Sequence, residues 1–183
     1  MTTTTIIVNG FARAGKDSFV AACKQHLHAQ GRWPFEFSSI TPVKDLIEEG
    51  AGIDLSAKTD ADRKLLADVG AALQAHSNWR TTRCLGFIEG YMKWGKRLTR
   101  DVVMFLHIRE PENIQKVITG VKDRNLGAIH TVLLRGPREV RVDNVADNAV
   151  LGMSYDDTLY NDSDLDALSV LAGNYLGRKG LIL

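Results

Sequence analysis

The sequence predicts an α/β domain in which a five-stranded parallel sheet carries helices on both faces. Short apolar segments rich in β-branched residues alternate with longer segments whose apolar residues recur every three or four positions. This alternation is typical of strands joined by helical crossovers, and therefore of a parallel sheet. The chain has 183 residues, of which 44% are apolar and 25% charged, as expected for one compact domain with a sizeable core.

The expected elements follow one another in a regular order. The expected strands are short and apolar and cover residues 6–8, 35–37, 102–108, 129–134 and 158–160. The expected helices are amphipathic and cover residues 16–30, 43–49, 60–76, 84–94 and 111–121, with a last helix from about residue 164. The polar stretch 136–156 is longer than an ordinary connection in a compact domain, and such stretches are usually functional, for example as lids.

Charge and composition exclude several classes of protein. There are 23 basic and 22 acidic residues, a balance that argues against a protein dedicated to coating nucleic acid. No apolar run approaches the roughly 18 residues that a membrane span needs, and the first residues lack the pattern of a signal peptide, so a cytoplasmic protein is expected. Cys23 and Cys84 stand far apart and are expected as reduced core thiols. The apolar tail 181–183 is compatible with a homodimer interface.

The motif with the clearest chemistry lies at residues 10–18, Gly-Phe-Ala-Arg-Ala-Gly-Lys-Asp-Ser, which fit G-x-x-x-x-G-K. It follows an apolar strand and precedes an amphipathic helix, which is the context that a phosphate-binding loop requires. Glycines let such a loop wrap tightly, so that backbone N–H groups point at phosphate oxygens while the helix start adds its positive end. The motif predicts that ATP is bound by Gly10, Ala12, Arg13, Ala14, Gly15, Lys16, Asp17 and Ser18, with Lys16 catalytic.

The residue after the lysine departs from the usual motif. A serine or threonine normally follows the lysine, whereas here Asp17 follows it and Ser18 comes next. Asp17 could approach Mg²⁺ directly or through water, and Ser18 could bond a phosphate oxygen. Both are therefore candidate metal-binding residues, and which of them serves the metal stays open.

Four further segments follow the loop in a characteristic order. They are Ser-Ser-Ile-Thr-Pro-Val-Lys-Asp-Leu-Ile at 38–47, the charged helix start at 58–66, Ile-Arg-Glu-Pro-Glu-Asn at 108–113 and Tyr-Asp-Asp-Thr-Leu-Tyr-Asn-Asp at 155–162. Together with the loop, they resemble the bacteriophage-type deoxynucleoside monophosphate kinases, relatives of adenylate kinase, over nearly the whole chain. One departure concerns the end of the strand, because that family often carries an acidic residue just before the arginine, whereas this sequence has His107-Ile108-Arg109.

The resemblance implies a P-loop NTPase fold in which residues 38–100 form an acceptor-binding insertion and residues 136–156 a lid. It also implies Mg²⁺-dependent transfer of a phosphoryl group from ATP to a small-molecule nucleotide, a deoxynucleoside monophosphate, to give the diphosphate. Arg63 at the start of the insertion helix would then bind the acceptor phosphate; otherwise it is a solvated helix charge. Lys44 is a further candidate for substrate binding.

Arginines are expected around the transferring group because a guanidinium fork matches phosphate oxygens. Arg109 follows the strongest strand at its carboxyl end, where ligands of open α/β sheets bind, and is a candidate for both catalysis and acceptor binding. The alternative for Arg109 is an ion pair with Glu110 or Glu112, and Glu112 could instead orient it or serve as a structural cap. In or beside the lid-like stretch, Arg135, Arg138 and Arg141 are candidates to close over ATP, with Arg135 assigned to catalysis and Arg138 to ATP binding.

Two other functions remain open. One is a P-loop kinase acting on a hydroxyl of a modified base in DNA or of a small molecule, and only this alternative makes DNA a partner. The other is a nucleotide-binding regulatory module without turnover. A cluster of basic residues interleaved with Trp79, Tyr91 and Trp94 would favour the DNA kinase if its aromatic rings stacked on bases. The alternative is a solvated basic face with the aromatic residues packed inward.

Overall fold

The computed structural model describes residues 2–137, 150–162 and 164–183. Its strands are β1 (Thr3–Asn9), β2 (Trp33–Ser38), β3 (Val102–His107), β4 (Ala128–Arg135) and β5 (Asp157–Tyr160). Its helices are α1 (Lys16–Ala29), α2 (Thr41–Ala51), α3 (Asp60–Ser77), α4 (Trp79–Leu98), α5 (Pro111–Asp123) and α7 (Leu165–Arg178), with a short 3₁₀ helix, η1, at Val150–Gly152.

The five strands form one parallel sheet in the order β2-β3-β1-β4-β5, which confirms the predicted fold class. β1 lies in the centre, between β3 and β4, and all seven of its residues are buried. A strand that is covered on both faces and paired on both edges reads as a continuous β-branched run, as β1 does.

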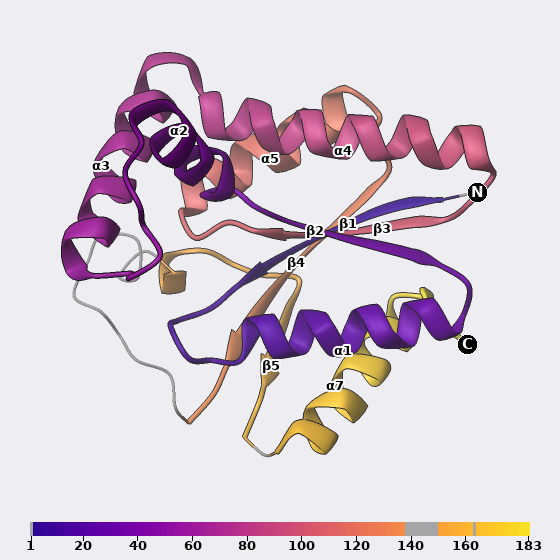
Figure 1. Ribbon diagram of the computed structural model, residues 1–183. Helices are drawn as coiled ribbons and strands as arrows, with labels where there is room; N and C mark the ends of the chain where they lie inside the picture. The colour runs from indigo at the N-terminus through magenta and orange to yellow at the C-terminus, as the bar shows by residue number, and fades with distance from the viewer. Residues whose placement is uncertain (1, 138–149, 163) are drawn as a thin grey trace.

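Helices cover both faces of this sheet (Figure 1). α1 and α7 lie on one face, where Phe19, Cys23 and Leu27 of α1 join a buried cluster with β1 and β3. α4 and α5 lie on the other face, where a second cluster includes Cys84. The two cysteines are free and lie on opposite faces, and burial raises the pKa of Cys84 to about 12, so it stays a protonated core thiol.

The crossover from β2 to β3 contains α2, α3 and α4. Figure 1 shows α2 and α3 beyond the carboxyl ends of the strands, whereas α4 runs along the sheet. α4 extends beyond the expected 84–94 at both ends, and its first turn is held by Trp79, which packs against the cluster of Val43, Ile47 and Leu55, and by Arg80, which pairs with Glu110. The expected insertion 38–100 thus includes a helix of the covering layer, and its acceptor-binding role stays a prediction.

The strand order predicts a ligand-binding crevice at the carboxyl edge of the sheet, between the ends of β1 and β3. The chain leaves β1 toward β2 through α1 and leaves β3 toward β4 through α5, so the connections after these two neighbouring strands diverge. Ligands of open α/β sheets bind where connections diverge in this way. The phosphate-loop motif after β1 and Arg109 after β3 therefore flank one crevice.

No helix in the described part of the chain combines the length and the apolar character needed to cross a membrane.

Candidate active site

The phosphate-loop motif forms a tight turn between β1 and α1 that only glycine permits at two positions. Gly10 has φ +147°, and a Cβ there would lie 2.3 Å from the carbonyl oxygen of Leu134. Gly15 has φ +90°, and a Cβ there would lie 2.4 Å from Nδ2 of Asn161. The loop therefore closes against β4 and the end of β5, and side chains at these positions would fill the space that shapes the cradle.

Lys16 is the first residue of α1 and turns back over the loop. Its Nζ donates hydrogen bonds to the carbonyl oxygens of Gly10 and Phe11, each at 2.7 Å. These contacts keep the ammonium at the mouth of the loop, beside the start of α1. Positive charge from Lys16 and from the helix start suits the phosphates of ATP, so this cradle fits the predicted cofactor.

The candidate metal residues Asp17 and Ser18 lie in the exposed first turn of α1. No group of three or more His, Cys, Asp or Glu side chains among the described residues could hold a metal ion. Mg²⁺ beside a nucleotide is usually held by one or two carboxylates together with the substrate phosphates, so a lone carboxylate such as Asp17 fits this mode.

His107, at the carboxyl end of β3, forms a polar cluster with β2 and α1. Its Nε2 lies 3.1 Å from Oε1 of Glu36, whose Oε2 accepts a hydrogen bond from Lys24 at 3.1 Å. Burial lowers the pKa of His107, and the nearby carboxylates of Glu36 and Asp17 only partly oppose this effect. The imidazole is therefore neutral near pH 7 and has a carboxylate partner.

Two of the predicted arginines lie at the carboxyl edge of the sheet. Arg109 is exposed and follows β3 by two residues, on the other side of the crevice from the phosphate loop. Arg135 ends β4, and its guanidinium lies 5.6 Å from the ring centroid of Phe11 in the phosphate loop. The fold thus places Lys16, Arg109 and Arg135 on three neighbouring strand ends, where phosphoryl groups would need positive charge.

The other predicted substrate residues lie farther from the loop. Arg63 is exposed in the first turn of α3 and pairs with Asp60 at 3.0 Å. Lys44 in α2 pairs with Glu48. Each pair follows helical spacing, so local geometry alone explains it. Their acceptor-binding roles stay predictions.

The acids expected as alternative partners of Arg109 are engaged elsewhere. Glu112 is largely exposed and pairs with Lys116 at 2.7 Å, one helical turn away, while Glu110 pairs with Arg80. Arg138 and Arg141 lie outside the described residues, as does most of the lid-like stretch.

Arg80 was expected only as part of the basic cluster, yet it is buried, with 7% of its surface exposed. Its guanidinium binds both carboxylate oxygens of Glu110, at 2.9 and 3.1 Å, and donates to Oγ of Ser39 at 2.9 Å. Burial raises the pKa of Glu110, but the charge and hydrogen bonds of Arg80 outweigh it and hold the pKa below its ordinary value. This ion pair joins α4 to the loops that follow β2 and β3.

Two aromatic residues of the basic cluster pack against the edge strand β2, although Trp94 keeps 36% of its surface exposed. Tyr91 and Trp94 on α4 meet aromatic rings on β2, with centroids 3.9 Å apart for Phe35–Tyr91 and 4.6 Å apart for Trp33–Trp94. Phe87 stacks on Phe37 in the same way. These rings attach α4 to the edge strand β2, in line with the second of the two interpretations.

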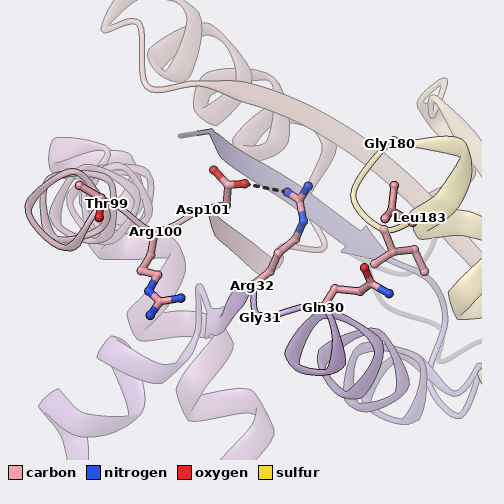
Figure 2. Close-up of a pocket in the computed structure, with 9 residues that line it drawn as sticks. Gln30, Gly31, Arg32, Thr99, Arg100, Asp101, Gly180 and Leu183 are labelled. Atoms are coloured by element: carbon pink, nitrogen blue, oxygen red, sulfur yellow. Dashed lines mark ion pairs between the residues drawn. The ribbon is translucent and has the colours of Figure 1, made fainter.

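A separate hollow of about 650 Å³ lies at the opposite, amino-terminal edge of the sheet (Figure 2). It is lined by the turn before β2, the loop before β3 and the residues after α7. Arg32 and Asp101 form an ion pair there at 3.4 Å. Because the phosphate loop is at the carboxyl edge, this hollow does not belong to the candidate active site.

No family model and no curated protein sequence matches this chain. The fold is similar to that of the tunicamycin resistance protein of Deinococcus radiodurans, with a TM-score of 0.57, 16% identity, and coverage of 99% of this chain and 98% of that one. It is also similar to Mycobacterium tuberculosis APS kinase in complex with AMPPNP and APS, with a TM-score of 0.50, 13% identity, and coverage of 96% and 98%. The chain therefore has the fold of P-loop kinases. This likeness does not single out deoxynucleoside monophosphate kinases among them.

Proposed function

We propose that this chain is a P-loop kinase that transfers the γ-phosphoryl group of ATP to a deoxynucleoside monophosphate. The observation that carries the proposal is the phosphate loop with Lys16 at its mouth, next to the end of β3, the strand that Arg109 follows. Donor phosphates would lie on the loop, and the acceptor phosphate would lie on the side of Arg109. The sequence motifs at 38–47, 58–66 and 155–162 support the nucleotide as acceptor.

The residues at the crevice suit phosphoryl transfer because that reaction needs positioning and charge more than covalent chemistry. Lys16 would offset negative charge on the transferring group, and Arg109 would hold the acceptor phosphate with a guanidinium fork. Asp17 or Ser18 would hold Mg²⁺, which neutralises charge on the phosphates of ATP when it is bound. A phosphate acceptor is already an anion, so this reaction requires no general base.

The test is a panel of acceptors with ATP and Mg²⁺. ADP formation is measured with dAMP, dGMP, dCMP and dTMP separately, with hydroxymethylated DNA, and with no acceptor. Phosphorus NMR of the products distinguishes a new diphosphate from a new phosphate monoester. The proposal predicts a diphosphate from at least one of the four nucleotides. ADP formed equally fast without an acceptor, or no ADP at all, would contradict it.

A second candidate is a kinase that phosphorylates a hydroxyl group, and one observation favours it. The neutral His107 lies at the end of β3, and the carboxylate of Glu36 on β2 lies 3.1 Å from its Nε2 and binds Lys24 of α1. A hydroxyl acceptor must lose its proton, and either group could accept it. Under this alternative, a phosphate monoester appears in the panel, and Glu36→Gln lowers its formation.

Salt dependence separates a polymeric acceptor from a small one. Binding of DNA through several phosphates weakens by orders of magnitude between low and moderate salt, whereas a mononucleotide loses little. The contacts of Tyr91 and Trp94 with aromatic rings on β2 make these two residues less available for stacking on DNA bases. We therefore expect an acceptor KM that changes little between about 50 and 200 mM salt.

A further inference from the structure

Asn9 is a fully buried polar residue at the end of β1, directly before the phosphate loop. Its neighbours along the strand, Ile7 and Val8, are core residues. A buried amide is costly unless its oxygen and nitrogen find hydrogen-bond partners. The partners of Asn9 therefore reveal which parts of the fold meet at this point.

The side chain of Asn9 joins three separate segments. Its Oδ1 accepts a hydrogen bond from the backbone N–H of Gly10 at 2.8 Å. Its Nδ2 donates to the backbone carbonyl oxygen of Arg109 at 3.0 Å and to the hydroxyl oxygen of Tyr155 at 2.8 Å. Because an N–H can only donate and a carbonyl can only accept, these partners fix the orientation of the amide.

The hydroxyl of Tyr155 is the acceptor for the second N–H of this amide. Its hydroxyl accepts from Asn9 and donates to the carbonyl oxygen of Val150 at 2.9 Å. Burial raises the pKa of Tyr155, so the hydroxyl keeps its proton and remains a donor. The amide of Asn9 thus has one arrangement that satisfies all of its partners.

We propose that Asn9 couples the phosphate loop to the acceptor side of the site, and that Tyr155 is the positioning residue that holds Asn9 in register. Gly10 belongs to the donor loop, and Arg109 belongs to the connection after β3 on the other side of the crevice. The Gly10 N–H and the Arg109 carbonyl oxygen bind the same side-chain amide. Any shift of the Gly10 N–H on phosphate binding therefore shifts the position of the group that binds the Arg109 carbonyl oxygen. Occupancy of the donor loop therefore steadies the backbone that presents Arg109. The inference rests on the proposed function only in treating the loop as the ATP site.

Hydrogen exchange tests this coupling without an acceptor. A non-hydrolysable ATP analogue is added to the wild-type chain, and exchange is followed in peptides that cover residues 10–18 and 107–113. We expect slower exchange in both peptides of the wild type. In Tyr155→Phe, which removes only the hydroxyl, we expect protection of 10–18 to remain and the added protection of 107–113 to be lost.

A matched variant controls for the loss of a tyrosine hydroxyl. Tyr160 is exposed in β5, and Tyr160→Phe should behave as the wild type in both peptides. Asn9→Ala removes the amide itself and should lose the protection of 107–113 as Tyr155→Phe does. The double variant should lose no more than either single variant, because both act through one set of hydrogen bonds. Tyr155→Phe keeps the test valid where Asn9→Ala does not fold.

Binding affinities give a second measure. Calorimetry compares the dissociation constant of the accepted nucleotide with and without the ATP analogue. We expect the analogue to tighten acceptor binding about fivefold or more in the wild type, and less than about twofold in Tyr155→Phe. The affinity of Tyr155→Phe for the ATP analogue alone should stay within about threefold of the wild-type affinity.

The outcomes separate this inference from the proposed function. If the analogue does not bind the wild-type chain, both are wrong. If it binds but none of the four nucleotides is phosphorylated, the proposed acceptor is wrong, and the exchange experiment still decides the coupling. Equal protection of 107–113 in wild type and Tyr155→Phe, or none in the wild type, would overturn the coupling alone.

Discussion

Arg80 and Glu110 form a two-pronged ion pair that links α4 to the start of α5, with N–O distances of 2.9 and 3.1 Å. The guanidinium is buried, and it also binds Ser39 in the loop after β2. The connection that carries Arg109 is therefore held in place by α4, which lies on the same face of the sheet as α5.

The first prediction concerns this ion pair. Arg80→Ala leaves Glu110 without its partner and should lower the free energy of unfolding by about 2–3 kcal/mol, less than for a fully buried pair because Glu110 is partly solvated. Arg80→Lys should recover part of the loss, since an ammonium cannot reproduce the fork. Urea unfolding measures both. Arg83→Ala is the control, because Arg83 is exposed on the same helix. Equal stability of Arg80→Ala and wild type would show that the pair contributes nothing.

The second prediction concerns Lys16. Lys16→Ala should lower kcat by about 10²-fold or more, because the ammonium offsets charge that is greater in the transition state than in the bound substrate. Unfolding temperature should change little, since Lys16 lies at the mouth of the loop rather than in the core. Lys122→Ala, on the exposed surface of α5, serves as the control. Undiminished turnover in Lys16→Ala would remove the phosphate-loop assignment.

The third prediction assigns Arg109 to the acceptor. A charge-assisted hydrogen bond contributes roughly 1.5–3 kcal/mol, so Arg109→Ala should weaken acceptor binding about 10- to 150-fold and also slow turnover. ATP affinity, measured by calorimetry without an acceptor, should stay within about threefold. Arg124→Ala, at the far end of α5, is the control. Loss of ATP affinity with acceptor affinity retained would place Arg109 on the donor side instead.

The fourth prediction concerns pH. The pKa of His107 lies below its ordinary value near 6.5, mainly because of burial, so the unfolded chain binds a proton at a higher pH than the folded chain. The stability that this provides is fully present above pH 6.5 and is lost as the pH falls through the folded-state pKa. His107→Gln should therefore show a smaller fall in unfolding temperature between pH 7 and pH 5.

His130 contributes in the same direction, because burial also lowers its pKa, so His107→Gln removes only part of the acid dependence. The exposed His28 provides the matched control, and the unfolding temperature of His28→Gln should fall between pH 7 and pH 5 as much as that of the wild type. If the unfolding temperature of His107→Gln falls with pH as steeply as that of the wild type, the pKa of His107 does not change on folding.

The elements that could be predicted from the sequence are those with a strong local pattern. The β-branched run in β1 and the apolar run in β3 mark central strands, and the glycines and lysine of the loop have a spacing that local geometry dictates. The length of α4 could not be predicted, because its packing against β2 and β3 overrides a glycine-containing helical sequence.

The residues that the sequence did not reveal act through distant partners. Arg80 is 30 residues from Glu110, and in the sequence it is one of several cations on a helix. Asn9 is 100 residues from Arg109 and 146 from Tyr155, so no spacing rule connects them. Asn9 and Asn161 stand beside recognisable motifs, and a polar residue at the end of an apolar strand is the only local sign of their role.

The contact between Asn161 and the phosphate loop bears on protein synthesis. Nδ2 of Asn161 donates to the carbonyl oxygen of Ala14 at 3.1 Å across 147 residues, and the N–H of Asn161 binds Arg135. The loop sequence is translated well before Asn161, which follows Ala14 by 147 residues. A nascent chain that stops before β5 would contain the whole motif and still lack the support that shapes it. Nucleotide binding should therefore begin only after β5 and Asn161 have been translated.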